Sequence, residues 1–192
     1  MDKTVTLPCN FVGSFKVGDN IVYNCTILVE LAAKNQEGIF NKMIVLQAAA
    51  ILEACMAEII YRAKYFTAEG VPPIDQKIIA DIQSKQLDKF NHVIDAFKKH
   101  KMLDGLGEDI YKDLHWLRAL RNKFHIQDSP KSYDKNVVLP KDEVDLYSDE
   151  SVAWSLRLLN EVIQLLGHEY ARPGSKGRYV NDVIIPQANS TA

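Results

Sequence analysis

Apolar residues recur every three or four positions over five stretches of this chain, and polar residues fill the positions between them. That spacing puts the apolar side chains on one face of an α-helix. Connections rich in Gly, Pro, Asn and Asp separate the stretches. The pattern predicts an all-α fold, an up-and-down bundle of about five helices with strand content near zero. The predicted helices cover residues 19–33, 39–66, 75–101 (with a break near Ser84), 109–127 and 148–167.

The two ends of the chain lack this period. Residues 1–16 contain Pro8 and Gly13, and the alternation over residues 4–7 permits either a short strand or an ordered arm. Residues 172–192 are rich in Gly and Pro and are expected to form a tail, with an extended piece over residues 179–185. The expected organisation is an arm (1–16), a helical bundle (17–171) and a tail (172–192).

The second predicted helix, residues 39–66, is apolar on most of its sides, as is typical of the central helix of a bundle. Its alanines allow neighbouring helices to approach closely. Glu53 is an exception among apolar neighbours, and it is expected to be a buried structural carboxylate or a partner of a cation elsewhere. Glu58 and Arg62, one turn apart, are interpreted as an ordinary surface pair.

Composition narrows the class of protein. A net charge of −2 over 192 residues gives no overall basic field for nucleic acid, so any such binding needs a local patch. Cys9, Cys25 and Cys55 have unrelated spacings and are expected to be reduced, which favours a cytoplasmic location. The N-terminus lacks the apolar core of a signal peptide, and the most apolar run, residues 43–52, is too short and too close to charges to span a bilayer.

The helix predicted over residues 109–127 (DIYKDLHWLRALRNKFHIQ) contains the most informative feature. Its spacing places Arg121 in the middle of the apolar arc and His125 one turn further, at the edge of that arc. A guanidinium there is costly to bury unless a carboxylate faces it, or unless this face borders a cleft or an interface. The arc consists of Ile110, Leu114, Leu117, Leu120 and Phe124.

Two interpretations of this pair remain open. In one, Arg121 is part of a structural ion pair and His125 is a satisfied core histidine. In the other, the pair acts on phosphodiesters: the histidine moves a proton and the arginine stabilises the charge that develops on phosphorus. Neighbouring basic side chains that could follow an RNA backbone, or simply form a solvated face, are Arg118, Lys123, Lys131 and Lys135.

The segment Leu117–His125, LRALRNKFH, resembles the signature helix of the HEPN superfamily (higher eukaryote and prokaryote nucleotide-binding domains). That family is a bundle of four to five helices, and its motif is an Arg, a polar residue and a downstream His. Arg121, Asn122 and His125 match these positions. Three residues separate Arg121 from His125, where the family usually has four to six, and Gln127 stands where some toxin members have a tyrosine.

The resemblance implies a metal-independent endoribonuclease or an RNA-binding protein, active as a homodimer with the motif helices facing each other. It implies Arg121 as the phosphate-binding residue, His125 as the general acid or base and Asn122 as an orienting residue, with Glu53 and Arg118 in support. The alternatives are a non-catalytic helical interaction module, and a toxin neutralised by a nucleotidyltransferase-type antitoxin protein.

Other chemistries lack a signal in the sequence. His92, His100, His115 and His168 have no metal-ligand spacing, and no Glu-x-x-His or glycine-rich phosphate loop occurs. We therefore expect no metal and no cofactor. Trp116 lies off the main apolar stripe and marks either an interface or a second core face.

Overall fold

The computed structural model describes residues 4–65, 74–123, 142–173 and 179–187. Its helices and strands, in chain order, are β1 (Thr4–Pro8), α1 (Lys16–Ala33), α2 (Asn41–Tyr65), α3 (Gln76–Gln83), α4 (Phe90–Lys99), the 3-10 turn η1 (Asp104–Leu106), α5 (Ile110–Asn122), α6 (Glu143–Leu146), α7 (Asp149–Glu169) and β2 (Asp182–Pro186). The prediction of a mostly helical bundle is confirmed.

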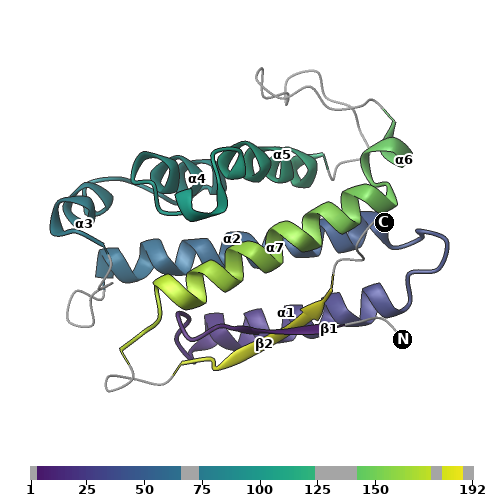
Figure 1. Ribbon diagram of the computed structural model, residues 1–192, viewed down its shortest axis with the longest axis horizontal. Helices are drawn as coiled ribbons and strands as arrows, with labels where there is room; N and C mark the ends of the chain where they lie inside the picture. The colour runs from purple at the N-terminus through teal and green to yellow at the C-terminus, as the bar shows by residue number, and fades with distance from the viewer. Residues whose placement is uncertain (1–3, 66–73, 124–141, 174–178, 188–192) are drawn as a thin grey trace.

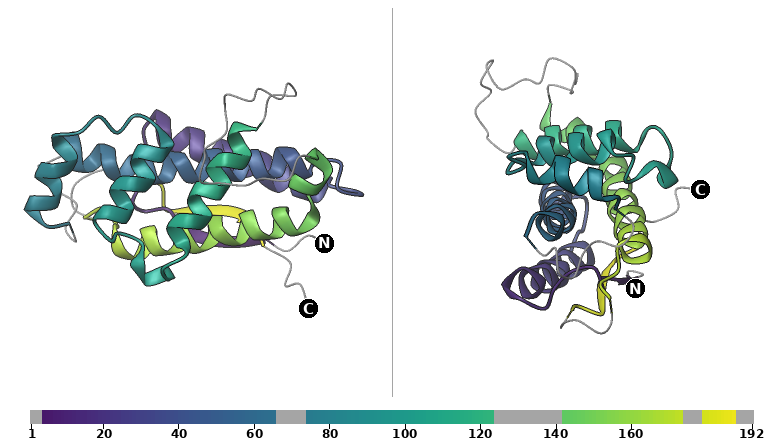
Figure 2. Two further views of the ribbon diagram at one scale, coloured as in Figure 1. Left: turned by 90° about the horizontal axis from the view of Figure 1, so that it is seen from above. Right: turned by 90° about the vertical axis from the view of Figure 1, so that its left-hand side faces the viewer.

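The elements form three layers (Figure 1). Helices α2 and α7 lie in the middle layer, α3, α4 and α5 cover one side of them, and α1 and the two-stranded sheet cover the other (Figure 2). Helices α1 and α2 run in opposite directions. The chain from α3 to α5 again runs opposite to α2, and α7 runs in the same direction as α2 (Figure 1). The segment predicted as a helix over residues 75–101 consists of two short helices, α3 and α4. The predicted break near Ser84 lies between them and is confirmed.

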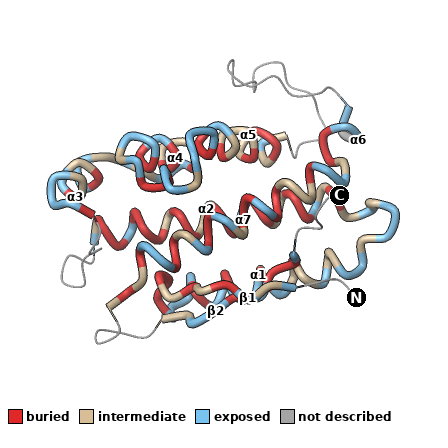
Figure 3. The backbone as a smooth tube through the Cα atoms, in the orientation of Figure 1, coloured by how far each residue is buried: buried red, intermediate tan, exposed pale blue. Residues whose placement is uncertain are grey.

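Helix α2 is the central element of the core (Figure 3). Leu52, Cys55, Met56 and Ile59 are fully buried, and Ala48 and Ala49 let the neighbouring helices come close. By length and composition alone α2 could cross a membrane, but 61% of its most apolar stretch is buried inside the protein. The core helix of a soluble domain has these same properties.

The prediction of almost no strand content is wrong. Strands β1 and β2 pair antiparallel, with Leu7 opposite Val183 and Val5 opposite Ile185. Leu7, Val183 and Ile185 are buried, whereas Ile184 between them is 53% exposed, which is the alternation expected of a half-buried strand. The segments expected as an arm and a tail therefore pair with each other and cover α1 and α7.

Gly167 was expected to end the last helix, but α7 continues to Glu169. A Cβ atom at Gly167 would lie 2.5 Å from the carbonyl oxygen of Pro8, so the glycine lets the end of β1 lie directly against α7. The start of α7 is as predicted: the Ser148 side chain accepts a hydrogen bond from the backbone N–H of Ser151 at 3.3 Å.

The interpretation of Glu58 and Arg62 as a surface pair is wrong. Arg62 is fully buried and donates hydrogen bonds to the carbonyl oxygens of Phe11 (3.1 Å) and Tyr170 (2.7 Å). Glu58 is 7% exposed and faces Arg172, with 3.6 Å between Oε1 and Nη1. Helical spacing suggested a surface pair because it cannot show that the segments before α1 and after α7 cover this face of α2.

The three cysteines, far apart in the sequence, meet at the same place in the core. Cys9 lies after β1, Cys25 on α1 and Cys55 on α2, and all three are free and buried. Burial raises the pKa of the Cys25 thiol to about 12, and a hydrogen bond to Cys9 together with burial raises the pKa of Cys55 well above its usual value. Such thiols are protonated and unreactive at neutral pH.

Replacing Arg172 with alanine tests the role of the buried charges. We expect the Arg172→Ala variant to lose about 3 kcal/mol of unfolding free energy in urea, because the buried Glu58 carboxylate loses the guanidinium that faces it at 3.6 Å. The control is Arg157→Ala, which removes an exposed arginine on α7 and should change stability by less than about 0.5 kcal/mol. Equal losses in the two variants would contradict a structural role for the Glu58–Arg172 pair.

Candidate functional site

Arg121 lies in the last turn of α5 and reaches across to α2. Its Nη1 atom is 2.5 Å from Oε2 of Glu53, in the middle of α2. The Arg121 side chain is 36% exposed and that of Glu53 is 26% exposed. Of the alternatives that the sequence left open, a facing carboxylate is present: it is Glu53, and it leaves part of the guanidinium open to solvent.

The packing of α5 explains this position. Leu114, Leu117 and Leu120 are fully buried and fix α5 against the core. Arg121 shares the face of these leucines but lies in the last turn of α5, at the border of the core, so its side chain stays 36% exposed. A position at that border avoids most of the desolvation cost of a buried charge.

A second contact orients the guanidinium. The Cζ atom of Arg121 lies 6.0 Å from the centre of the Phe90 ring, and Phe90, the first residue of α4, is itself buried. The carboxylate and the ring hold the guanidinium on two sides. Because Arg has five N–H donors in a planar fork, the part that remains exposed can still donate to an anion.

The other predicted site residues lie close by or outside the described part of the chain. Asn122 is exposed at the end of α5, and Arg118 and Lys123 are half-buried on the same helix or directly after it. His125, Lys131 and Lys135 lie outside the described residues. The structure thus brings Arg121 and Glu53 together, beside Asn122 and Arg118.

Sequence reasoning missed Tyr147, which fixes the end of α5. Its hydroxyl donates a hydrogen bond of 2.9 Å to the carbonyl oxygen of Leu120. The last carbonyls of a helix have no partner within the helix, so this bond stabilises the terminus that positions Arg121. Lys42 of α2 lies over the Tyr147 ring, with Nζ 5.5 Å from its centre. The sequence placed Tyr147 only in a connection and gave no sign of this contact.

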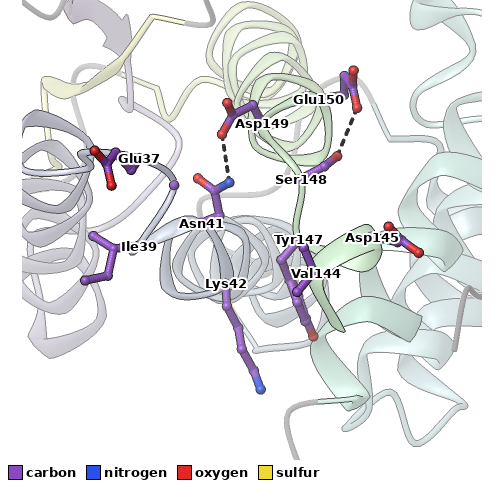
Figure 4. A pocket seen from close by; sticks show the side chains of 11 residues that line it. Glu37, Ile39, Asn41, Lys42, Val144, Asp145, Tyr147, Ser148, Asp149 and Glu150 are labelled. Atoms are coloured by element: carbon purple, nitrogen blue, oxygen red, sulfur yellow. Dashed lines mark hydrogen bonds between the residues drawn. The ribbon is translucent and has the colours of Figure 1, made fainter. Parts of the chain in front are cut away.

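Tyr147 also lines a cleft of about 620 Å³ at the end of the bundle. The cleft lies between the α1–α2 connection and the start of α7, and α6 forms one of its sides (Figure 4). Its lining contributes one lysine, Lys42, against four carboxylates. The excess of negative charge makes this cleft unfavourable for a phosphate group. The carboxylates are those of Glu37, Asp145, Asp149 and Glu150.

Trp116 is half-buried and packs against the core. Its ring lies edge-to-face on that of Trp154 of α7, with 4.8 Å between the ring centroids. Burial raises the pKa of the Asp113 carboxyl, one turn before Trp116 on α5. Of the two interpretations of Trp116, the contact supports a second core face.

Within the described residues, no three His, Cys, Asp or Glu side chains lie close enough together to hold a metal ion. These residues are 4–65, 74–123, 142–173 and 179–187. At Arg121 the structure shows a guanidinium oriented by Glu53 and Phe90. This arrangement can bind and stabilise an oxyanion.

Comparison of the chain with models of protein families, with curated proteins and with solved structures found no match. The function therefore has to be argued from the residues and their geometry.

A double-mutant cycle on Glu53 and Arg121, with alanine at each position, measures how strongly the pair is coupled. We expect a coupling free energy of about 1 kcal/mol in urea unfolding, because the pair is close and only partly exposed. The exposed pair Glu30–Lys34 on α1 is the control, and about 0.3 kcal/mol is expected there. Coupling at Glu53–Arg121 no larger than at Glu30–Lys34 would show that the guanidinium is not held by Glu53.

Proposed function

We propose that this protein is a HEPN-type domain that binds RNA and cleaves it as a homodimer in the cytoplasm. The observation that supports the proposal is Arg121, which is oriented by Glu53 and Phe90 yet 36% exposed. The exposed part of the guanidinium can still donate to an anion. Arg121 also begins the segment Arg-Asn-x-x-His, the part of the chain that resembles the family's motif.

In the proposed reaction the 2′-oxygen of the RNA attacks the adjacent phosphorus, and the bond from phosphorus to the 5′-oxygen breaks. His125 takes the proton of the 2′-hydroxyl or donates one to the departing 5′-oxygen. Arg121 binds the non-bridging oxygens, on which negative charge develops. The products are a 2′,3′-cyclic phosphate and a 5′-hydroxyl. Asn122 orients one of the reacting groups.

The open face of α2 supports the homodimer. Glu53 lies in the middle of a stripe of small or half-buried residues on this helix: Leu46, Ala50, Ala54 and Ala57. Small residues let two helices pack closely, and helices that cross at about 50° diverge towards their ends. A twofold axis near Ala54 would bring the two copies of Arg121 to one shared groove.

One observation favours the second candidate, a non-catalytic interaction module. The Glu53 carboxylate offsets the charge of Arg121 and lowers the attraction of the site for phosphate. The three-residue separation of Arg121 and His125 points the same way. A toxin held by an antitoxin protein is compatible with the ribonuclease proposal, since the antitoxin would cover the shared groove.

Alanine at His125 or Arg121 tests the cleavage reaction. We expect each variant to cleave a mixed-sequence single-stranded RNA about 100-fold more slowly than the wild type, because proton transfer or charge stabilisation is lost. The measurement is a gel assay of 3′-end-labelled RNA in buffer with EDTA.

The matched controls are His168→Ala and Arg157→Ala, both exposed on α7. They should cleave at the wild-type rate. If His125→Ala also cleaves at the wild-type rate, the ribonuclease proposal is wrong. If the wild type binds RNA without cleaving it, the protein is a binding module.

Arginine at Ala54 tests the dimer. The Ala54→Arg variant should change the mass measured by light scattering from twice the 21.7 kDa of the chain to that of one chain, because a long charged side chain cannot be buried at a close helix crossing. Ala33→Arg, at the exposed end of α1, is the control and should stay dimeric. Dimers of the Ala54→Arg variant would place the interface elsewhere.

A further inference from the structure

A second cleft, of about 350 Å³, lies on the outer side of α4. The connection between α3 and α4 supplies Lys85, and α4 supplies His92 and Lys99. Unlike the cleft at the other end of the bundle, this one has two lysines in its lining, against one carboxylate, Asp95. Asp95 is drawn towards α5, where it lies 3.3 Å from Nε2 of His115.

One carboxylate holds the two lysines side by side. Asp81 of α3 accepts hydrogen bonds from Nζ of Lys85 (2.7 Å) and from Nζ of Lys99 (2.8 Å), and it also contacts Nε2 of His100 (2.8 Å). These contacts, that of Lys85 first, keep the pKa of the Asp81 carboxyl well below its usual value. The side chains of Lys85 and Lys99 remain 37% and 53% exposed, and each ammonium group has three N–H donors. They can therefore donate to a further anion from a fixed position.

The surrounding segment is basic in a chain that is otherwise acidic. Residues 75–101 contain six lysines and four aspartates, whereas the whole chain has a net charge of −2. The local excess of positive charge favours a polyanion at this face of the molecule.

A pair of exposed aromatic rings lies beside the lysines. Tyr61 and Tyr65, one turn apart at the end of α2, have ring centroids 5.0 Å apart and are 49% and 65% exposed. Lys64, between them in sequence, donates a hydrogen bond of 2.5 Å to the carbonyl oxygen of Lys85. This bond joins the end of α2 to the mouth of the second cleft. Exposed aromatic rings next to lysines are typical of surfaces that bind single-stranded nucleic acid, because bases stack on the rings.

Helix α4 connects this surface to Arg121. Its first residue, Phe90, lies against the Arg121 guanidinium, and its last residue, Lys99, lines the second cleft. Ten residues of α-helix span about 15 Å, which corresponds to about four stacked nucleotides at roughly 3.4 Å each. A strand with a phosphate at Arg121 would therefore reach the second cleft within about four nucleotides.

We infer that the Lys85–Lys99 cleft and the Tyr61–Tyr65 pair form a binding surface for single-stranded RNA that flanks the proposed cleavage site. Lys64, Lys85 and Lys99 contact the backbone, and Tyr65 stacks on a base. The inference rests on the proposed function, because it gives the RNA a path away from Arg121. It adds a group of residues, remote from the motif helix, that sets affinity and strand preference.

Fluorescence anisotropy of a labelled single-stranded RNA of about 12 nucleotides tests this surface. All variants contain His125→Ala so that the RNA stays intact. Tyr65→Ala should weaken binding about 10-fold through the loss of a stacked base. Lys85→Gln combined with Lys99→Gln should lower the slope of log Kd against log salt by about 1.4, since each phosphate contact on a single strand contributes about 0.7.

The matched controls are Tyr23→Ala, on α1 and 66% exposed, and the double change Lys16→Gln with Lys34→Gln, at the first residue of α1 and directly after its last. Both should bind RNA like the His125→Ala parent. If the Tyr65 and Lys85–Lys99 variants bind like these controls, or if an RNA duplex of the same length binds as tightly as the single strand, the surface is wrong. The surface is also wrong if the Tyr65 and Lys85–Lys99 variants lose binding to phosphatidylserine vesicles but still bind RNA like the controls.

The cleavage assay separates this inference from the proposed function. If Arg121→Ala does not cleave RNA while the Tyr65 and Lys85–Lys99 variants bind RNA as tightly as their parent, the binding surface is wrong and the ribonuclease proposal stands. Wild-type cleavage by His125→Ala would overturn the ribonuclease itself, whatever the cleft variants bind.

Discussion

Helix α2 packs against α1, α3, α4, α5 and α7, and the two strands in turn pack on α1 and α7. Its alanines remove the bulk that would hold these helices apart, so the contacts are close. The stripe from Leu46 to Ala57 remains partly open, and within it Glu53 contacts Arg121 of α5. The same helix therefore provides both the core and the surface on which the proposed site and dimer depend.

Two Glu–Arg contacts involve α2, and their surroundings give them different roles. Glu58 and Arg172 are both nearly enclosed and connect α2 to the segment after α7. Glu53 and Arg121 lie at a border, close together but partly exposed. A buried ion pair contributes to specificity of packing, since either charge alone would be costly there. A pair at the surface keeps its charges available to a third group, which is what binding a phosphate requires.

Charge is divided along the length of the bundle. The larger cleft, beside the start of α2, has four carboxylates against one lysine, whereas the cleft on α4 has two lysines against one carboxylate. The end of α5, which carries Arg121, contacts residues beside both clefts. Tyr147, which lines the larger cleft, donates a hydrogen bond to Leu120, and Phe90, the first residue of α4, lies against the Arg121 guanidinium. Asp81 also contacts both lysines of the cleft on α4, so the excess of positive charge at this face comes from the whole of residues 75–101, with six lysines and four aspartates. For the proposed polyanion at Arg121, this excess favours a path towards α4, and the carboxylates near Tyr147 oppose the other direction.

The sequence by itself determined where the main helices lie, the break near Ser84, the Ser148 cap and the need for a carboxylate, a cleft or an interface opposite Arg121. Each of these follows from local spacing, capping chemistry or the cost of a buried charge, which act over one or two helical turns. The sequence did not predict α6, and it extended the helix of Arg121 to residue 127, whereas α5 ends at Asn122. The HEPN resemblance, and with it the role of His125, remains a prediction.

Only the tertiary structure decided that residues 4–8 and 182–186 pair, that Arg62 is buried, that three cysteines meet, and that Lys85 and Lys99 share Asp81. In each case the partners lie on different elements of the chain. The spacing of hydrophobic residues shows which face of a helix or strand is buried. Which other segment covers that face depends on how the whole chain packs.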